Sequence, residues 1–185
     1  MVERSKNILG RAMPDSEVSY AYLDSPVGPL LIAGDAERLL RISFPSRGGR
    51  VAPEPGWRHD PGPLAEALRQ IGDYFGGDRL DFSLPLHVEG GPLQMAVWKS
   101  MREIPYGRTV SYGDIAADLG DATAARLVGA ACGANPLPIV IPCHRVVGAD
   151  GSLTGFGGGL PTKRFLLALE QRVFPQPGLQ LSLFG

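Results

Sequence analysis

The sequence predicts an α+β fold built from two units, and three observations carry this prediction. Short apolar segments between residues 19 and 44, separated by turn signals, are typical of a β-meander. Residues 64–75 place their large apolar side chains on one helical face. After residue 90, short helical patterns follow one another across glycine-containing turns. Strands in the first half and helices in the second favour a sheet-bearing unit followed by a helical one.

The first unit is expected to span residues 1–86. Strands are predicted at 20–23, 30–33 and 39–44, with turns at Asp24–Gly28 and Gly34-Asp35. Residues 45–63, rich in Pro, Gly and Arg, are predicted to form a loop, and the helix over 64–75 should stop at Gly76-Gly77. The polar residues 1–17 are expected to be disordered, and the sequence leaves open whether they are native.

The second unit is expected to span residues 87–173. It opens with a helix over 93–104, whose inward residues should be Leu93, Val97, Met101 and Ile104, with Trp98 beside them. Ser111 is a suitable N-cap for a short helix over 112–119 that Gly120 ends. A helix of small residues over 122–132 completes a helix-turn-helix pattern. These small residues fit close packing on a neighbouring helix and close approach to DNA equally well. A last helix is predicted over 162–170, and residues 174–185 form a flexible tail.

Composition narrows the class of protein. The chain has 185 residues, 44% of them hydrophobic, and a mean hydropathy of +0.01, as expected for a globular protein. No apolar run approaches the ~18 residues of a membrane span. The first residues lack the apolar core of a secretory signal, so we expect a cytoplasmic protein. Net charge is −1, from −3 over residues 1–90 and +2 over residues 91–185. Any DNA-binding face should therefore be modest and local.

The segment around the second cysteine carries the clearest chemical signal. The only cysteines are Cys132 and Cys143, and neither belongs to a CxxC pair, so we expect no metal site and no disulfide. Cys143 and His144 are adjacent, after an apolar run at 138–141 that predicts a buried strand ending at Pro142. A neighbouring base or cation lowers a thiol pKa from about 8.5 to roughly 3.5–7.5, which makes a nucleophile. The alternative is a small packing residue at a strand end.

The run IPCHRVVGADGSLTGFGGGL, with the upstream segments IPYGRTVSYGDIA and AARLVGAACGANPLP, resembles the O6-alkylguanine-DNA alkyltransferases. The resemblance is strong from Gly91 to Glu170 and weaker from Tyr20 to Leu86. It implies a ribonuclease-H-like α/β domain before a winged-helix-like domain. It also implies irreversible, stoichiometric transfer of an alkyl group from O6-alkylguanine or O4-alkylthymine to Cys143, without a cofactor. The base would be flipped out through the minor groove. A zinc site of some relatives needs cysteines that this chain lacks.

The resemblance assigns catalytic roles to five residues. Cys143 is the nucleophile, and Glu170 orients His144 as its base. Asn135 ties the helix-turn-helix to the active-site strand, and Tyr112 donates to the flipped guanine. Taken without the resemblance, Glu170, Asn135 and Tyr112 have ordinary explanations. A carboxylate at a helix end is usually solvated, Asn before Pro often starts a turn, and a tyrosine at a helix start is often half-buried.

The resemblance also predicts the DNA and base contacts. Arg126 should fill the space that the flipped base leaves, although an arginine on an alanine-rich helix can simply be solubilising. The expected DNA contacts are Arg126, Tyr112, Gly113, Asp121, Ala125 and Ala149. The expected pocket residues are Pro138, Val146, Val147, Ser152, Gly155, Phe156 and Gly157. Phe156 stands where many relatives have tyrosine, Gly157 where serine or alanine is frequent, and Leu93 where phenylalanine is frequent.

The remaining hypotheses concern a protein partner and alternative functions for the chain. Gln180–Phe184 resembles the short peptide that docks on the bacterial sliding clamp, although the same Leu/Phe pair could pack on the protein's own core. The chain is expected to act as a monomer. A non-enzymatic alkyltransferase-like protein is the alternative function, but such proteins lack the cysteine that is present here. A cysteine hydrolase would need an oxyanion hole, and no motif in the sequence suggests one.

Overall fold

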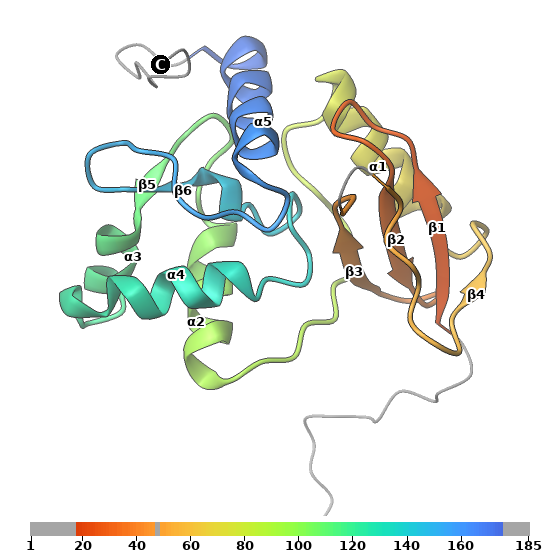
Figure 1. Cartoon of the computed structure of the whole chain (residues 1–185), viewed down its shortest axis with the longest axis horizontal. Coiled ribbons are helices and arrows are strands. Elements are labelled where there is room, and N and C mark those ends of the chain that lie inside the picture. The colour runs from red at the N-terminus through yellow and green to blue at the C-terminus, as the bar shows by residue number, and fades with distance from the viewer. Residues whose placement is uncertain (1–17, 47–48, 176–185) are drawn as a thin grey trace, which may run out of the picture.

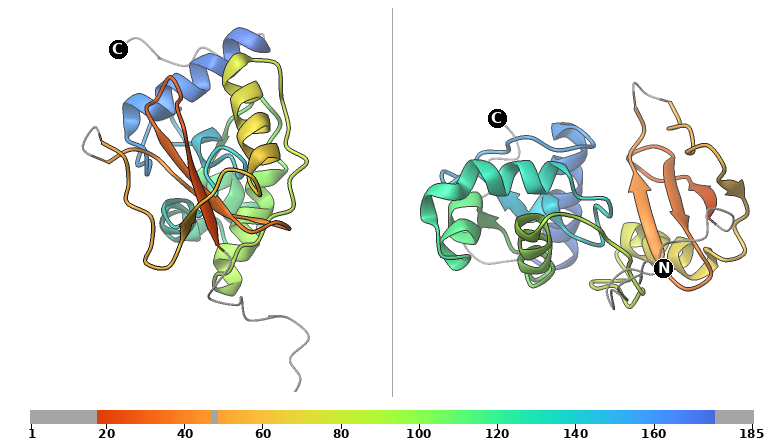
Figure 2. Two further views of the ribbon diagram at one scale, coloured as in Figure 1. Left: turned by 90° about the vertical axis from the view of Figure 1, so that its right-hand side faces the viewer. Right: turned by 90° about the horizontal axis from the view of Figure 1, so that it is seen from below.

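The structure is a computed structural model that describes residues 18–46 and 49–175. The predictions for residues 1–17 and for Gln180–Phe184 lie outside this range. Figure 1 shows a sheet with one helix on one side of the molecule and a group of helices on the other. The right-hand view of Figure 2 also shows the two parts side by side, and in the left-hand view the sheet lies in front of the helices. The predicted α+β fold is confirmed.

The N-terminal part is a four-stranded sheet in the order β3-β2-β1-β4. The three predicted strands are confirmed as β1 (Ser19–Leu23), β2 (Leu30–Gly34) and β3 (Leu39–Ser43), each antiparallel to the next. The predicted loop over 45–63 is wrong at one place, because β4 (Arg58–His59) pairs in parallel with β1. The Arg58 amide donates to the Val18 carbonyl at 3.0 Å, so the segment adds to the free edge of β1.

Helix α1 (Ala65–Gly76) packs against this sheet and confirms the predicted helix. Its apolar face contributes Ala67, Ile71 and Tyr74 to the core. Gly77 ends the helix with φ 87°, a left-handed conformation that glycine adopts without a steric penalty.

The C-terminal part contains α2 (Pro92–Arg102), α3 (Tyr112–Asp118), α4 (Ala125–Gly133) and α5 (Leu160–Val173). A 3-10 turn (Ala122–Ala124) precedes α4, and the short strands β5 (Val110–Ser111) and β6 (Val146–Val147) pair in parallel. Ser111 caps α3 as predicted, since its hydroxyl accepts from the Asp114 amide at 3.0 Å.

Two expectations for these helices are wrong. Leu93 is 39% exposed rather than inward, because it lies in the first turn of α2, beyond the edge of the core. Helix α5 runs to Val173, so Glu170 lies within its last turn rather than at its end. Glu170 has no exposed surface, so it is not a solvated carboxylate at a helix end, which was the alternative explanation for this residue.

One hydrophobic core runs through both parts. It joins Leu30 and Ile32 of the sheet with Val97 and Met101 of α2 in a single cluster. A backbone hydrogen bond also crosses the boundary, from the Ile42 amide on β3 to the Pro136 carbonyl at 2.9 Å. The sheet is therefore a direct neighbour of the segment that leads to Cys143. Within residues 18–46 and 49–175, no helix is long and apolar enough to cross a bilayer.

Candidate active site

The segment before Cys143 is a buried turn and not the predicted strand. The Ile141 amide donates to the Leu137 carbonyl at 2.8 Å, and Ile139 has φ 76°. A β-branched residue seldom adopts a positive φ, so the surroundings must hold this backbone in place. Asn135 does so from the end of α4: its side-chain amide donates to the Ile141 carbonyl at 2.7 Å and accepts from the Leu137 amide at 3.0 Å. The asparagine links the helix-turn-helix to the active-site turn.

Cys143 begins a 3-10 turn (Cys143–Arg145) and is only 6% exposed. Burial raises the pKa of its thiol to about 11, although a hydrogen bond from Asn135 and the charge of Lys163 act in the opposite direction. The pKa of this thiol is thus raised and not lowered, because burial outweighs the neighbouring donor and cation. The thiol is protonated at neutral pH and needs a base to react.

His144 and Glu170 form a buried hydrogen-bonded pair directly behind Cys143. The His144 Nε2 lies 2.7 Å from the Glu170 Oε1, and both side chains are fully buried. Burial lowers the pKa of His144, so the imidazole is neutral at neutral pH. With Nε2 donating to the carboxylate, Nδ1 is the unprotonated nitrogen. Nδ1 is buried and has no hydrogen-bond partner among the described residues, which leaves it able to accept a proton.

Glu170 is held by donors from three other parts of the chain. Tyr74 on α1 donates its hydroxyl to Oε1 at 2.9 Å, and the Gly107 amide donates to Oε2 at 2.9 Å. Arg145 donates from Nε to Oε2 at 3.0 Å. Burial alone would raise the pKa of Glu170, but His144 and Arg145 outweigh it and hold the pKa at about 2. The carboxylate stays ionised at every pH at which the protein is expected to work.

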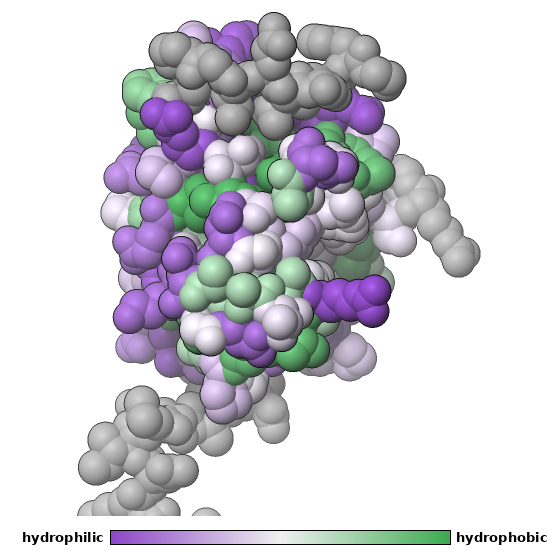
Figure 3. Space-filling view, turned by 90° about the vertical axis from the view of Figure 1, so that its left-hand side faces the viewer, coloured by the Kyte–Doolittle hydropathy of each residue, from purple (hydrophilic) through white to green (hydrophobic). Residues whose placement is uncertain are grey.

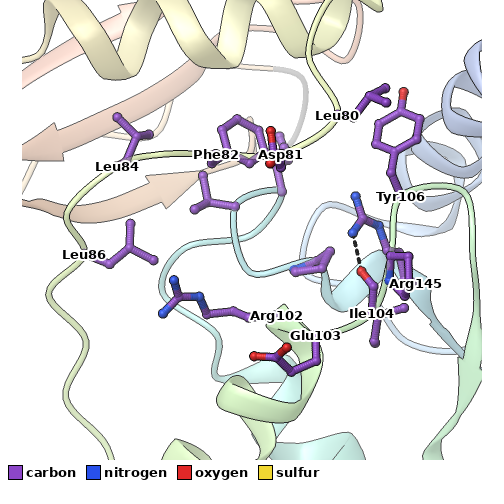
Figure 4. Close-up of a pocket in the computed structure, with 14 residues that line it drawn as sticks. Leu80, Asp81, Phe82, Leu84, Leu86, Arg102, Glu103, Ile104, Tyr106 and Arg145 are labelled. Carbon is purple, nitrogen blue, oxygen red and sulfur yellow. Dashed lines mark hydrogen bonds between the residues drawn. The ribbon is translucent and has the colours of Figure 1, made fainter.

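Arg145 also anchors the turn from behind. Its Nη1 donates to the Ile104 carbonyl at 2.6 Å, as Figure 4 shows. The side chain borders a cavity of about 230 Å³ between the end of α2 and the segment 80–86. Leu84 and Leu86 line that cavity on one side and Tyr106 lies opposite, next to Arg145. This cavity lies beside Arg145, at the end of the 3-10 turn Cys143–Arg145. A second, larger cavity beside α4 shares no lining residue with it.

The larger cavity, of about 540 Å³, is open to solvent between α3, α4 and the loop before α5. Its lining residues are Tyr112, Ala125, Arg126, Gly129, Gly133, Thr154, Gly155, Phe156 and Gly157. Of the seven predicted pocket residues, Gly155, Phe156 and Gly157 line it. Pro138, Val146 and Val147 are instead buried beneath the surface, and Ser152 is exposed outside the lining. Cys143 is not in the lining either. Burial raises the pKa of Tyr112, which does line the cavity, and the nearby Cys132 and Cys143 act in the same direction.

Lys163 on α5 connects the loop before α5 to β6, and sequence reasoning missed this residue. The side chain is fully buried, and its Nζ donates to the Val146 carbonyl at 2.6 Å and to the Thr154 carbonyl at 2.9 Å. The Tyr112 hydroxyl lies 3.5 Å from the same nitrogen. A buried ammonium with these acceptors fixes the loop of residues 152–159 to β6. It also places a positive charge beside Tyr112 and near Cys143.

The remaining predicted DNA contacts lie around the helix-turn-helix. Arg126 is exposed on α4, and Ala149 is exposed in the turn after β6. Asp121 accepts from the Thr123 amide at 2.9 Å and so caps the 3-10 turn before α4. Gly113 lies in the first turn of α3. Figure 3 shows hydrophilic and hydrophobic residues mixed on the side of α3 and α4.

The described residues contain no group of three or more His, Cys, Asp or Glu side chains that could hold a metal ion. Cys132 is buried on α4, where its thiol contacts the Met101 sulfur at 3.5 Å. Burial raises its pKa to about 12. This environment is that of a packing residue.

Comparison with known proteins agrees with this geometry. Residues 92–172 match a family model described as the DNA-binding domain of 6-O-methylguanine DNA methyltransferase, and residues 18–88 match its ribonuclease-like domain. The chain belongs to the O6-alkylguanine-DNA alkyltransferase family. The two domains of this alkyltransferase are thus a ribonuclease-like sheet domain and a helical DNA-binding domain, as the resemblance implied.

Curated relatives match this alkyltransferase over most of its length. A methylated-DNA–protein-cysteine methyltransferase from Mycolicibacterium paratuberculosis is 44% identical, over 90% of this chain and 99% of its own. One from Methanosarcina acetivorans is 44% identical over 82% and 97%. The crystal structure of Mycobacterium tuberculosis O6-methylguanine methyltransferase has a TM-score of 0.77 at 43% identity, over 91% of this chain and 99% of its own. The Mycobacterium tuberculosis OGT structure in complex with DNA has a TM-score of 0.78 at 43% identity, over 90% and 99%.

Proposed function

We propose that this chain repairs DNA by transferring an alkyl group, typically methyl, from the O6 atom of guanine to the sulfur of Cys143. O4-alkylthymine is a second substrate by the same chemistry. By its family, the chain is a transferase that acts on alkylated DNA and keeps the group on its own cysteine. The observation that carries the assignment to Cys143 is the buried His144–Glu170 pair directly after it. The thioether product is a poor leaving group, so each molecule acts once.

The transfer forms one S–C bond and breaks one C–O6 bond. The thiol proton passes to Nδ1 of His144, through a bridging water because side chains of adjacent residues diverge. Glu170 stabilises the imidazolium that forms. The guanine leaves as an anion and takes up one proton in place of the alkyl group, while His144 releases the proton that it received. In net, one proton passes from the sulfur to the guanine. The Tyr112 hydroxyl, which lines the cavity, donates a hydrogen bond to the leaving base, and Lys163 beside it adds positive charge.

DNA binding follows from where the cavity opens. The O6 atom of a stacked guanine is out of reach of a buried thiol, so the base must leave the helix and enter the 540 Å³ cavity. Helix α4 carries Arg126 at the cavity mouth, where its planar guanidinium can replace the lost base. Small residues on α4, with Gly113 and Ala149 nearby, allow the DNA backbone to approach from the minor-groove side.

Replacement of Cys143 by alanine tests this assignment. The Cys143→Ala variant should lose all transfer from an O6-methylguanine duplex but keep its binding to that duplex, since only the nucleophile is removed. A labelled methyl group and a gel-shift titration measure the two properties separately. Cys132→Ala is the matched control and should retain transfer, because Cys132 packs against Met101. Methyl transfer by the Cys143→Ala variant would contradict the assignment.

A sliding clamp is the second partner that we propose. Gln180–Phe184 follows a Pro/Gly-containing spacer, so Leu183 and Phe184 can enter an apolar pocket while Gln180 fixes their orientation. A fluorescent peptide of residues 174–185 should bind the cognate clamp saturably. The same peptide with Leu183 and Phe184 replaced by alanine should not bind. Equal signals from the two peptides would reject the clamp.

The setting of the reaction completes the proposal. A reduced thiol and genomic DNA occur together in the cytoplasm, and we place the protein there. All of the proposed catalytic residues come from one chain, which supports action as a monomer. The domain limits of residues 1–86 and 87–173, followed by a tail, are part of the same proposal.

A further inference from the structure

The loop that borders the cavity is supported from behind by the N-terminal domain. Phe44 follows β3 and is only 8% exposed, although it lies at the edge of the sheet. Its ring packs against that of Phe156, with centroids 5.3 Å apart and planes inclined by 54°. Phe156 in turn lines the 540 Å³ cavity. A side chain of the ribonuclease-like domain therefore touches the wall of the proposed substrate pocket.

Gly158 shows how tight this contact is. A Cβ atom on Gly158 would lie 2.7 Å from the Phe44 ring and 3.1 Å from the Phe156 ring, so the backbone is wedged against both. Gly155 and Gly157 differ, since a Cβ on either would meet no atom within 4 Å. The loop is thus closely packed where Gly158 meets Phe44, and it has free space beside Gly155 and Gly157.

Two anchors outside the loop limit how Phe44 and Phe156 can move. On the sheet side, the Ile42 amide donates to the Pro136 carbonyl at 2.9 Å and fixes the end of β3 next to the active-site turn. On the other side, Lys163 holds the Thr154 carbonyl at 2.9 Å. Phe156 stands between these anchors, and Phe44 is the aromatic side chain that backs it.

We propose that Phe44 is a positioning residue that fixes Phe156 and thereby sets the size of alkyl group that the cavity accepts. This inference rests on the proposed function, in which the cavity receives the flipped base. Without the Phe44 ring, Phe156 has room to retreat from the cavity. A wider cavity holds a methyl group less closely and accepts a larger group more readily.

The test compares transfer rates for two alkyl groups. Duplexes carrying O6-methylguanine and O6-benzylguanine are mixed with the full chain in single-turnover reactions. Phe44→Ala should lower the ratio of the methyl rate to the benzyl rate by about three- to tenfold, the value of one aromatic pair. Phe44→Leu, which keeps an apolar side chain and should fold readily, should shift the ratio in the same direction. Tyr20→Ala is the control, since it removes aromatic contacts with Tyr22 and His59 elsewhere on the sheet.

Amide hydrogen exchange tests the contact without any reaction. In the DNA-free protein, the amides of residues 156–159 should exchange faster in both Phe44 variants than in the wild type or in Tyr20→Ala. An unchanged rate ratio, or unchanged exchange in the loop, would overturn the role of Phe44. If the wild type transferred neither group, the proposed function would fail, and the exchange result would still decide whether Phe44 holds the loop.

Discussion

At the scale of single residues, the chemistry depends on a thiol that is protonated in the resting protein. Burial holds the pKa of Cys143 at about 11, and burial also keeps His144 neutral by lowering its pKa. The same low-polarity surroundings therefore suppress the thiolate and preserve the base that removes its proton. The sulfur therefore rests as the thiol, and the thiolate forms by transfer of its proton to a base.

The state of His144 gives a pH prediction. Burial lowers its pKa below the ordinary value of 6.5, so acidification to pH 6.5 should leave the base neutral and the transfer rate nearly unchanged. Glu170 acts to raise this pKa, while Arg145 and Lys163 act to lower it, and burial dominates. Single-turnover rates between pH 5 and 8, with circular dichroism to verify folding, measure the profile. A rate that halves at pH 6.5 or above would contradict the assigned environment.

Arg126 gives a prediction that separates duplex from single-stranded substrates. Arg126→Ala should slow repair of a duplex by about tenfold and leave a single-stranded oligonucleotide nearly unaffected, because only the duplex has a gap to fill. Arg102→Ala is the matched control, since Arg102 is an exposed arginine at the end of α2. Equal losses on the two substrates would show that Arg126 acts only through its charge.

At the scale of elements, Glu170 on α5 forms hydrogen bonds with α1 and with the 3-10 turn Cys143–Arg145. Tyr74→Phe removes one buried donor to a carboxylate, which should lower the free energy of unfolding by about 1.5–3 kcal/mol. Tyr106→Phe is a close control: its ring is also buried, but its hydroxyl has no hydrogen-bond partner among the described residues. Urea denaturation compares the two variants. Equal stabilities would show that the Tyr74 hydroxyl adds nothing to the network.

Local signals predicted most elements, and non-local contacts explain the errors. Amphipathic spacing and caps such as Ser111 and Gly77 act within a few residues, so α1 and α3 were predicted almost to their ends. The apolar run at 138–141 predicts a strand although it forms a turn, because its residues are buried in either conformation. The side chain of Asn135 decides between them, through bonds that no periodicity reveals.

At the scale of the whole molecule, the site draws on both domains. The motif around Cys143 predicts the nucleophile and its base, the family resemblance adds Glu170, and the structure brings His144 and Glu170 together. Tyr74 and Phe44 were missed because they lie in the other domain, far away in sequence. Lys163 was missed because a lysine in a helix is ordinarily a solvated residue. Only the three-dimensional fold shows that these side chains surround the site.

The central claim is that Cys143 itself receives the alkyl group, and intact-mass spectrometry tests it most directly. After incubation with a duplex that contains O6-methylguanine, the wild-type chain should gain the mass of one methylene, a methyl group in place of the thiol hydrogen. Peptide mapping should place that gain on Cys143. An unchanged mass, or a gain on Cys132, would contradict the account.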